Sequence, residues 1–521
     1  MALLNSFASW LMTKRMHQIE LFMKYPHEVQ NEWFRKLIES ARNTEWGKKF
    51  DYSSIETPEQ FSERVPLQDY DSMKPYIERI RRGGQNILWP TEIKWFAKSS
   101  GTTNDKSKFI PVSEESLEEC HYKGGKDMVA IYCNNYPETE IFTGKSLALG
   151  GSHFIDTYDN YESYHGDVSA ILMQHLPLWA EFFRAPDLSI ALMSNFEEKL
   201  DKMARATMTE NVTSIAGVPS WMNIFLKYIL DISGRKTIKD IWPNLEVYFH
   251  GGVNFTPYKE NFRQLFGKGN IHHFELYNAS EGFFGLQDQK KSSEFLLMLD
   301  YGIYYEFIPF NDLDNKNEKT IQLHEVKTGQ NYAMVISTNG GLWRYQLGDT
   351  IKFTSVNPYR FKITGRTKHF LNSFGEEVII DNTEKALKIA CEKSNASVKE
   401  YTVAPVFMEP FDSAQGDKSG AHEWLIEFEK SPEDLNYFSE VLDNALKSLN
   451  SDYEAKRFNN FVLRAPIVRQ IKEGTFYNWL RQKDKLGGQN KVPRLSNERK
   501  YVEEILRLTP NPSPEGEGSK G

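Results

Sequence analysis

Between residues 146 and 282 the sequence alternates short apolar segments with a helical segment, and the apolar segments end in glycine or polar residues. Strands that alternate with helices are typical of an α/β sheet, in which ligands bind beyond the strand ends. The chain is therefore predicted to contain such a sheet. The predicted strands and their turns are 146–151, 212–218, 245–252 and 271–282, and the helix is 220–232.

The pattern changes further along the chain of 521 residues, which is longer than one domain usually is. Short aromatic strands, predicted at 302–309, 320–326 and 331–338 and separated by polar turns, favour an antiparallel sheet or a small barrel-like subdomain at about 296–362. The predicted fold class is α/β, with mixed sheets and helices in a large N-terminal domain and a smaller α+β C-terminal domain. The predicted boundaries are 1–362 for the large domain, 363–508 for the small domain and 509–521 for a disordered tail rich in Pro, Gly, Ser and Glu.

Local signals predict several helices. Apolar residues recur at helical spacing within 7–42, and a helix over 75–82 is expected to carry Pro75 in its first turn and to end at Gly83. Ser113 is expected to cap another helix. In the small domain, helices are predicted near 382–393 and 432–450.

Composition limits the possible partners and location. The net charge is −8 and the charges are interspersed, so nothing indicates nucleic-acid binding. The three cysteines favour a reducing compartment and have no metal-ligand spacing. Lys14 and Arg15 follow the apolar N-terminal stretch instead of preceding it, which argues against a signal peptide, and no run of 18 apolar residues exists. A cytoplasmic monomer without membrane contact is expected.

The segment 99–108 packs five hydroxyl residues, one glycine and two lysines into ten residues, directly after the apolar stretch 93–97. A glycine- and hydroxyl-rich turn after a strand offers backbone N–H groups to an anion, and lysines add charge. The segment is neither a Walker loop nor a dinucleotide fingerprint. An ordinary polar loop is the alternative interpretation.

Two more segments could contribute to a nucleotide site. In 277–282, Tyr277 could stack on a purine and Glu281 could hold Mg²⁺, although a core tyrosine and a capping or solvated glutamate are the alternative. In 343–349, Asp349 follows a glycine and could accept hydrogen bonds from ribose hydroxyls, although a plain β-turn would look the same.

Taken together, these three segments resemble the motifs of the acyl-adenylate-forming enzymes, and specifically of the Gretchen Hagen auxin-responsive acyl acid–amido synthetases. The first resembles the phosphate loop of that family, the second its tyrosine–serine–glutamate motif, and the third its tyrosine-x-x-glycine-aspartate motif. The resemblance extends to about Arg494.

The resemblance implies a set of functional residues. Catalytic roles fall to Lys491, Lys108 and Glu281, of which Glu281 would also hold Mg²⁺ and Lys491 would serve adenylation alone. The implied nucleotide-binding residues are Ser99, Ser100, Gly101, Thr102, Thr103 and Lys108 around the phosphates, Gly251, Gly252, Val253 and Tyr277 along the adenine, Ser280 in the second motif, Asp349 on the ribose and Arg366 at the hinge into the small domain.

Two positions depart from the family pattern. Asp105 stands where the family loop often has glycine, and the neighbouring Lys106 is expected to offset its charge. Gln346 stands where plant members have arginine, and Arg344 is expected to replace that charge from another direction.

The function that the resemblance implies is ligation driven by ATP. The carboxylate of a small acid would attack the α-phosphate of ATP, pyrophosphate would leave and an acyl-adenylate would form, with lysines and Mg²⁺ stabilising the transition state. An amine, expected to be an amino acid, would then displace AMP. An acyl-CoA ligase and a non-catalytic nucleotide-binding protein are the alternatives.

Overall fold

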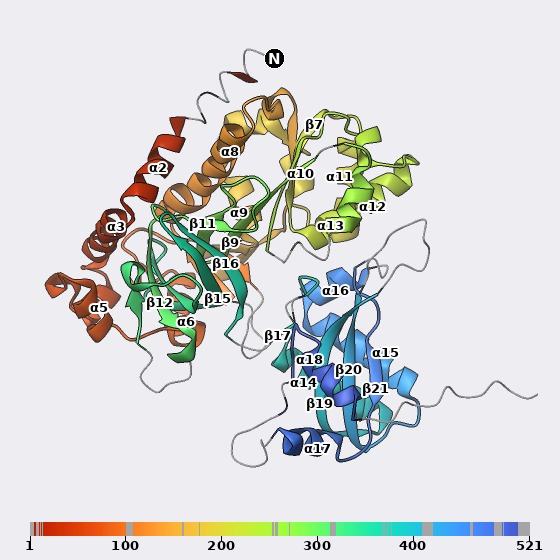
Figure 1. Ribbon diagram of the computed structural model, residues 1–521. Coiled ribbons are helices and arrows are strands. Elements are labelled where there is room, and N and C mark those ends of the chain that lie inside the picture. Colours follow the sequence, from red (N-terminus) through yellow and green to blue (C-terminus); the bar gives the residue numbers. More distant parts are fainter. Residues whose placement is uncertain are drawn as a thin grey trace, which may run out of the picture. The chain divides into compact units, whose positions relative to one another are not determined.

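The described residues form two compact units, a first unit up to residue 367 and a second unit from residue 370 (Figure 1). The predicted domain boundary at 362 and 363 lies before this division, inside a strand that pairs with two strands of the first unit. The computed structural model describes residues 5–6, 10, 12, 14–99, 108–158, 161–176, 178–252, 255, 259–269, 271–312, 319–367, 370–371, 373–376, 378–408, 420–458, 462–483, 492 and 494–508.

A sheet of 12 strands runs through the first unit, in the order β13-β12-β14-β15-β16-β11-β10-β9-β8-β7-β3-β6. The run from β6 to β9 is parallel and belongs to the α/β sheet that the sequence pattern predicts. Its strands are β3 (Lys145–Leu149), β6 (Arg184–Ala185), β7 (Val212–Gly217), β8 (Val247–Gly251) and β9 (His272–Ala279).

The remaining strands of this sheet are antiparallel and continue it directly, because β10 pairs with β9. Of the two predictions for 296–362, the antiparallel sheet is therefore the one observed. A separate barrel-like subdomain is not shown. These strands are β10 (Gly282–Leu286), β11 (Phe295–Leu297), β12 (Ile303–Pro309), β13 (Ile321–Gln322), β14 (Asn331–Thr338), β15 (Tyr345–Val356) and β16 (Tyr359–Arg366).

A second sheet of the first unit has four strands in the order β2-β1-β5-β4. Strand β1 (Trp95–Ser99) pairs antiparallel with β2 (Lys108–Val112) and parallel with β5 (Tyr161–Gly166). Strand β4 (His153–Tyr158) lies at the edge. The hairpin of β1 and β2 carries the first predicted motif in its connection.

Helices cover both faces of the parallel strands. Tyr132 of α8 packs on Phe249 and Phe274, whereas Phe262 of α13 stacks on Tyr248, the residue next to Phe249 on β8. Figure 1 shows α11, α12 and α13 gathered together. The helices are α2 (Met16–Lys24), α3 (Pro26–Ala41), α4 (Glu45–Lys49), α5 (Pro58–Arg64), α6 (Tyr70–Arg81), α7 (Glu114–Ser116), the π-helical turn η2 (Leu117–Tyr122), α8 (Lys123–Asn135), α9 (Val168–Gln174), α10 (Leu188–Ala191), α11 (Phe196–Thr207), α12 (Pro219–Ser233) and α13 (Lys259–Phe266).

Helix α6 begins earlier than predicted. Asp69 caps it by accepting a hydrogen bond from the backbone N–H of Ser72, whose hydroxyl bonds back to the N–H of Asp69. Pro75 therefore lies inside the helix and not in its first turn. The reciprocal cap outweighs the proline signal. Ser113 caps α7 as predicted, through the N–H of Ser116.

The second unit contains a three-stranded sheet, a short hairpin and five helices within its described residues. The predicted helices 382–393 and 432–450 are confirmed as α14 and α15. The predicted tail 509–521 lies outside the described residues. The elements of the second unit are β17 (Phe370–Leu371), β18 (Val378–Ile379), α14 (Ile380–Ser394), β19 (Ser397–Phe407), β20 (Gly420–Lys430), α15 (Leu435–Leu449), α16 (Ser451–Arg457), β21 (Ile467–Gln470), α17 (Thr475–Gln482) and α18 (Lys500–Leu506).

Among the helices that the structure describes, none combines the length and the apolar character that crossing a bilayer requires.

Candidate functional site

The second and third predicted motifs meet in one hydrogen bond. The hydroxyl of Tyr277, on β9, donates to the carboxylate of Asp349, on β15. In the sheet order β10, β11 and β16 lie between these two strands, which would place them roughly 19 Å apart if the sheet were flat. The sheet must therefore curl strongly here, so that residues 72 positions apart in the chain come into contact.

The ring of Tyr277 is also part of the core, as the alternative interpretation held. It lies 5.1 Å from the ring of Phe284 and 6.0 Å from that of Phe361, and the residue is 7% exposed. Asp349 is buried to the same extent. Tyr277 thus combines core packing with a hydroxyl that fixes the carboxylate predicted to bind ribose.

The backbone around Asp349 is fixed from the next strand. Gly348 has a φ of +90°, which favours glycine, and its carbonyl accepts a hydrogen bond of 2.8 Å from the N–H of Thr367. The antiparallel register pairs Asp349 with Arg366. The third motif and the predicted hinge arginine therefore lie side by side along the backbone.

The first motif is only partly visible. Ser99 and Lys108 are register partners at the end of the β1–β2 hairpin where the connection begins and ends, whereas Ser100, Gly101, Thr102, Thr103, Asp105 and Lys106 lie outside the described residues. The ammonium of Lys108 is buried and lies 3.4 Å from the hydroxyl of Tyr345. Because Tyr345 begins the strand that carries Asp349, this contact joins the hairpin to the third motif.

The predicted adenine segment continues the end of β8. A side chain at Gly251 would meet the carbonyl oxygen of Leu276 at 2.4 Å, and Gly252 has a φ of +82°. Both positions therefore require glycine. The register pairs Gly251 with Leu276, directly before Tyr277, and Val253 lies outside the described residues.

Ser280 and Glu281 form the turn between β9 and β10 and line a small cavity. His121, on the π-helical turn η2, also lines it, with Asn339 opposite. Burial lowers the pKa of His121 to about 4, and its Nδ1 has no hydrogen-bond partner within the described part of the chain. Sequence reasoning missed His121, since a single histidine in a helix carries no local signal.

Arg344 does not replace the charge missing at Gln346, which corrects the expectation. Its guanidinium forms a buried, bidentate pair with Glu306 at 3.0 and 3.1 Å. Its remaining nitrogens donate to the carbonyls of Ser62 and Val65 and to the hydroxyl of Thr320. A guanidinium that is saturated in this way cannot also turn towards a phosphate.

Family models match most of the chain. The GH3 family N-terminal domain matches residues 15–271, the central domain matches 296–366 and the C-terminal domain matches 381–500. The chain belongs to the GH3 family.

The relatives of this GH3 chain are distant but span its length. The indole-3-acetic acid-amido synthetase GH3.3 of Arabidopsis thaliana is 24% identical over 92% of this chain and 91% of that protein. The solved structure of the GH3.15 acyl acid amido synthetase covers 95% of the chain and 96% of its own at a TM-score of 0.58 and 17% identity. A 2-hydroxyisobutyryl-CoA ligase, solved with 2-HIB-AMP and CoA, covers 93% of each chain at a TM-score of 0.54 and 14% identity. Both solved structures share the fold of this GH3 chain.

The GH3 chain carries a second buried carboxyl group near this site. Burial raises the pKa of Glu275 to about 7. Glu275 lies two residues before Tyr277 on β9, so both side chains face the same side of the strand. Sequence reasoning missed Glu275, although this period-two spacing from Tyr277 could have indicated it.

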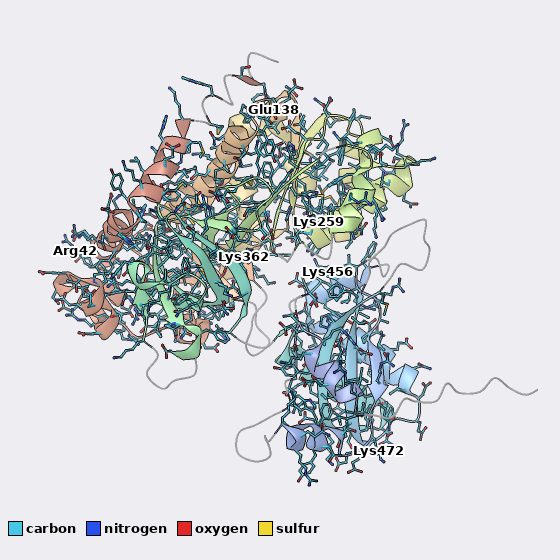
Figure 2. All side chains as sticks on the ribbon, in the orientation of Figure 1. Arg42, Glu138, Lys259, Lys362, Lys456 and Lys472 are labelled. Carbon is cyan, nitrogen blue, oxygen red and sulfur yellow. The ribbon has the colours of Figure 1, made fainter. Side chains whose placement is uncertain are left out.

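Histidines at the ends of β8 and β9 pack in aromatic layers. His250 stacks on Phe255 with 4.0 Å between ring centroids, and His272 stacks on Tyr136 at 3.8 Å. Burial lowers the pKa of His273 to about 4, and Lys259 on α13, labelled in Figure 2, acts in the same direction. These histidines are held neutral in the core of the GH3 chain.

Mg²⁺ would find suitable oxygen ligands at the turn after β9. Glu281 offers a carboxylate and Ser280 a hydroxyl, and a Mg²⁺ ion that binds phosphates usually uses one or two carboxylates. Across the described ranges, no three His, Cys, Asp or Glu side chains cluster as metal ligands. An ion held chiefly by substrate phosphates fits this arrangement.

The predicted catalytic residue Lys491 lies outside the described residues.

Proposed function

We propose that this GH3 chain is an ATP-dependent ligase that activates a small carboxylic acid as an acyl-adenylate. It then transfers the acyl group to the amine of an amino acid. The contact between Tyr277 and Asp349 carries the proposal, because it joins two of the three nucleotide motifs in a chain of this family. The amido synthetase activity of its relatives supports the same reaction.

In the first half-reaction, the chain's own groups would bind ATP and stabilise the charge that builds on the α-phosphate. Asp349, held by Tyr277, accepts hydrogen bonds from the ribose hydroxyls. Lys108 and the segment 99–103 donate to the phosphates. Mg²⁺ held by Glu281 would neutralise phosphate charge when bound.

The adenine is assigned to the strand ends next to Tyr277. Gly252 is exposed and leaves its backbone open to a flat ring, whereas Gly251 lets β8 pack closely on Leu276, directly before Tyr277. We assign Val253 to the same surface and Ser280 to the phosphate side of the second motif. Arg366 is assigned to the hinge, since its register partner is Asp349.

In the second half-reaction, the amine attacks the acyl carbonyl and AMP leaves. We propose that the small domain moves between the two steps as the unit that follows β16, so that the boundary predicted at 362 and 363 is shifted past the end of this strand, and that 509–521 is a disordered tail. Lys491 would then act in adenylation alone. A conformational step between half-reactions is a known way to exchange catalytic groups.

Exchange of labelled pyrophosphate into ATP tests the first half-reaction. The purified full-length chain is incubated with ATP, Mg²⁺ and one acid at a time, from a panel of aromatic and aliphatic carboxylic acids. Exchange that depends on an acid supports the proposal. Exchange at background with every acid would favour a nucleotide-binding protein without activity.

Lys491→Ala separates the two half-reactions. We expect pyrophosphate exchange to fall about 100-fold or more, because a cation at the α-phosphate is lost from the transition state. Attack of an amino acid on a supplied acyl-adenylate should stay within about twofold of the wild-type rate. Equal losses in both assays would contradict the role assigned to Lys491.

An acyl-CoA ligase is the second candidate, since a 2-hydroxyisobutyryl-CoA ligase shares the fold. Both enzymes form an acyl-adenylate and differ in the acceptor. Incubation of the acyl-adenylate with amino acids or with CoA distinguishes them by product. Formation of an amide supports the proposal, and formation of a thioester alone would replace it.

The setting in which the enzyme works is also proposed. We place it in the cytoplasm as a monomer that binds neither nucleic acid nor membrane. No disulfide bond joins the described cysteines, and the net charge of −8 does not favour nucleic acid. Sedimentation of the purified chain at micromolar concentration tests the monomer.

A further inference from the structure

Four adjacent parallel strands end along one edge of the large sheet, and the residues there form a continuous row. The second motif follows β9, Gly251 and Gly252 end β8, Gly217 ends β7, and Gly150 and Gly151 follow β3. Ligands of such sheets bind beyond the carboxyl ends of the strands. Neighbouring strands are about 4.8 Å apart, so the end of β3 lies roughly 10 Å from that of β8.

This row gives the two substrates different places, an inference that rests on the proposed function. The nucleotide motifs occupy the ends of β8 and β9 and the side towards Asp349. An acyl group joined to the α-phosphate then has the ends of β7 and β3 available. The turn at Gly150 and Gly151 is therefore the place where the acid would be positioned.

A buried lysine holds that turn. Lys199 on α11 is 3% exposed, and its ammonium donates to the carbonyl oxygen of Gly150 at 2.5 Å and to that of Gly151 at 3.0 Å. Charge-assisted hydrogen bonds of this kind are about twice as strong as neutral ones. Both Gly150 and Gly151 remain half-buried and within reach of a ligand.

The opposite side of the turn is held by the chain that follows β5. Asp167 accepts a hydrogen bond from the N–H of Ser152, and Ser169 accepts one of 3.1 Å from the N–H of Gly151. A side chain at Gly151 would overlap the Asp167 carboxylate, with 1.5 Å between Cβ and Oδ2. Because β5 pairs with β1, Asp167 links this turn to the strand that enters the phosphate segment.

We infer that Lys199 is a positioning residue for the carboxylic acid substrate: through the two glycine carbonyls it fixes the turn after β3 against which the acyl group is held. Burial lowers the pKa of Lys199 to about 8, against the attraction of Asp167. Lys98 on β1 is the other charged group that acts on Asp167.

Three variants of the full chain test this role. Lys199→Met keeps the length of the side chain but removes its charge and its donors, and Lys199→Arg restores both. The matched control is Thr213→Val at the opposite end of β7, where the buried hydroxyl donates to the carbonyl of Ile141 at 2.6 Å. Both Lys199→Met and Thr213→Val leave a buried carbonyl oxygen without its donor.

The kinetic measurement is pyrophosphate exchange with the acid that gives the highest wild-type rate among indole-3-acetic acid, a 4-substituted benzoate and short aliphatic acids. Lys199→Met should raise KM for the acid about tenfold and KM for ATP less than about twofold. Lys199→Arg should recover most of the loss, and Thr213→Val should change neither KM. A rise in both KM values, or a rise no larger than in Thr213→Val, would overturn the role.

Hydrogen–deuterium exchange tests the same contact without turnover. Exchange at the amides of Gly151 and Ser152 should be faster in Lys199→Met than in wild type and unchanged in Thr213→Val. Equal exchange in wild type and Lys199→Met would refute the hold on the turn. A wild-type chain inactive with every acid would refute the proposed function while leaving this measurement interpretable.

Discussion

The parallel and antiparallel parts of the large sheet stabilise their buried charges in different ways. In the antiparallel part, Arg344 pairs with Glu306 and Arg360 pairs with Asp288, each through bidentate contacts. In the parallel part, Glu275 has no such cation among the residues that the structure describes, and burial raises its pKa to about 7. The pKa of Lys199 is lowered to about 8 for the same reason.

This difference has a consequence for pH. A bidentate guanidinium–carboxylate pair keeps both partners charged across the neutral range. A buried carboxyl or ammonium group without such a partner instead titrates close to neutrality. We therefore expect the carboxyl edge of the parallel strands, where the substrates are placed, to be the pH-sensitive part of the sheet.

The largest expected effect comes from breaking a pair in the antiparallel part. Arg344→Met should destabilise the fold by about 3–5 kcal/mol, because it leaves the buried charge of Glu306 without its cation. Thermal unfolding measures the loss. The double variant Arg344→Met with Glu306→Gln should recover part of it, and a double variant as unstable as the single one would show that the charge is not the cause.

The second largest effect is expected at Asp349, whose carboxylate accepts a hydrogen bond from the hydroxyl of Tyr277. Asp349→Asn should lower kcat/KM for ATP in pyrophosphate exchange by about 100-fold, because two charge-assisted hydrogen bonds to ribose weaken. KM for the acid should change little. If kcat/KM for ATP stays within about twofold of wild type, Asp349 does not bind the ribose.

Glu275→Gln tests the titratable character of the parallel part. The folded-state pKa of about 7 lies above the ordinary value of 4.5, so the folded chain binds more protons than the unfolded chain between these values. Wild-type stability should therefore fall as the pH rises from 4.5 to 7. Above pH 7 the variant should be more stable than wild type by about 1–3 kcal/mol, and near pH 4.5 the difference should vanish.

Thermal unfolding at pH 5 and pH 8 measures this change. The exposed Glu63→Gln serves as control and should show no difference between the two pH values. If Glu275→Gln shifts the unfolding temperature equally at both, burial of Glu275 does not couple stability to pH, and the contrast between the two parts of the sheet weakens.

The smallest expected effect comes from Tyr277→Phe. It removes the hydroxyl that bonds to Asp349 and leaves the ring packed on Phe284. Stability should fall by about 1 kcal/mol, and kcat/KM for ATP should fall about fivefold, because the carboxylate is held less firmly. An effect on kcat/KM for ATP as large as that of Asp349→Asn would mean that the hydroxyl contributes more than positioning.

Much of the fold could be predicted from local pattern. The parallel strands end at the glycine and polar turns that the sequence indicates, and 331–338 is a strand as expected. The segment 320–326 was predicted as a strand but is mostly a 3-10 turn, since Gln322 and Glu325 form a reciprocal cap. A separate barrel-like subdomain is not shown, because β11 and β10 join the aromatic strands to the main sheet.

The candidate site could be predicted less completely. The motifs named Tyr277, Glu281 and Asp349, but assigned Tyr277 to adenine without its bond to Asp349. The expectation for Arg344 failed because its partner Glu306 lies on β12, far from it in the chain. Glu275 and His121 owe their shifted pKa values to burial, which one segment does not reveal.

The sequence by itself determined that strands alternate with helices and end in glycine or polar turns, and which family the motifs resemble. These properties follow from side-chain periodicity and backbone preference within a few residues. The tertiary structure alone decided that Tyr277 meets Asp349, that Arg344 is taken by Glu306 and that Lys199 reaches the turn after β3. Such contacts depend on strand order, on register and on the curl of the sheet, which are set by packing between distant segments.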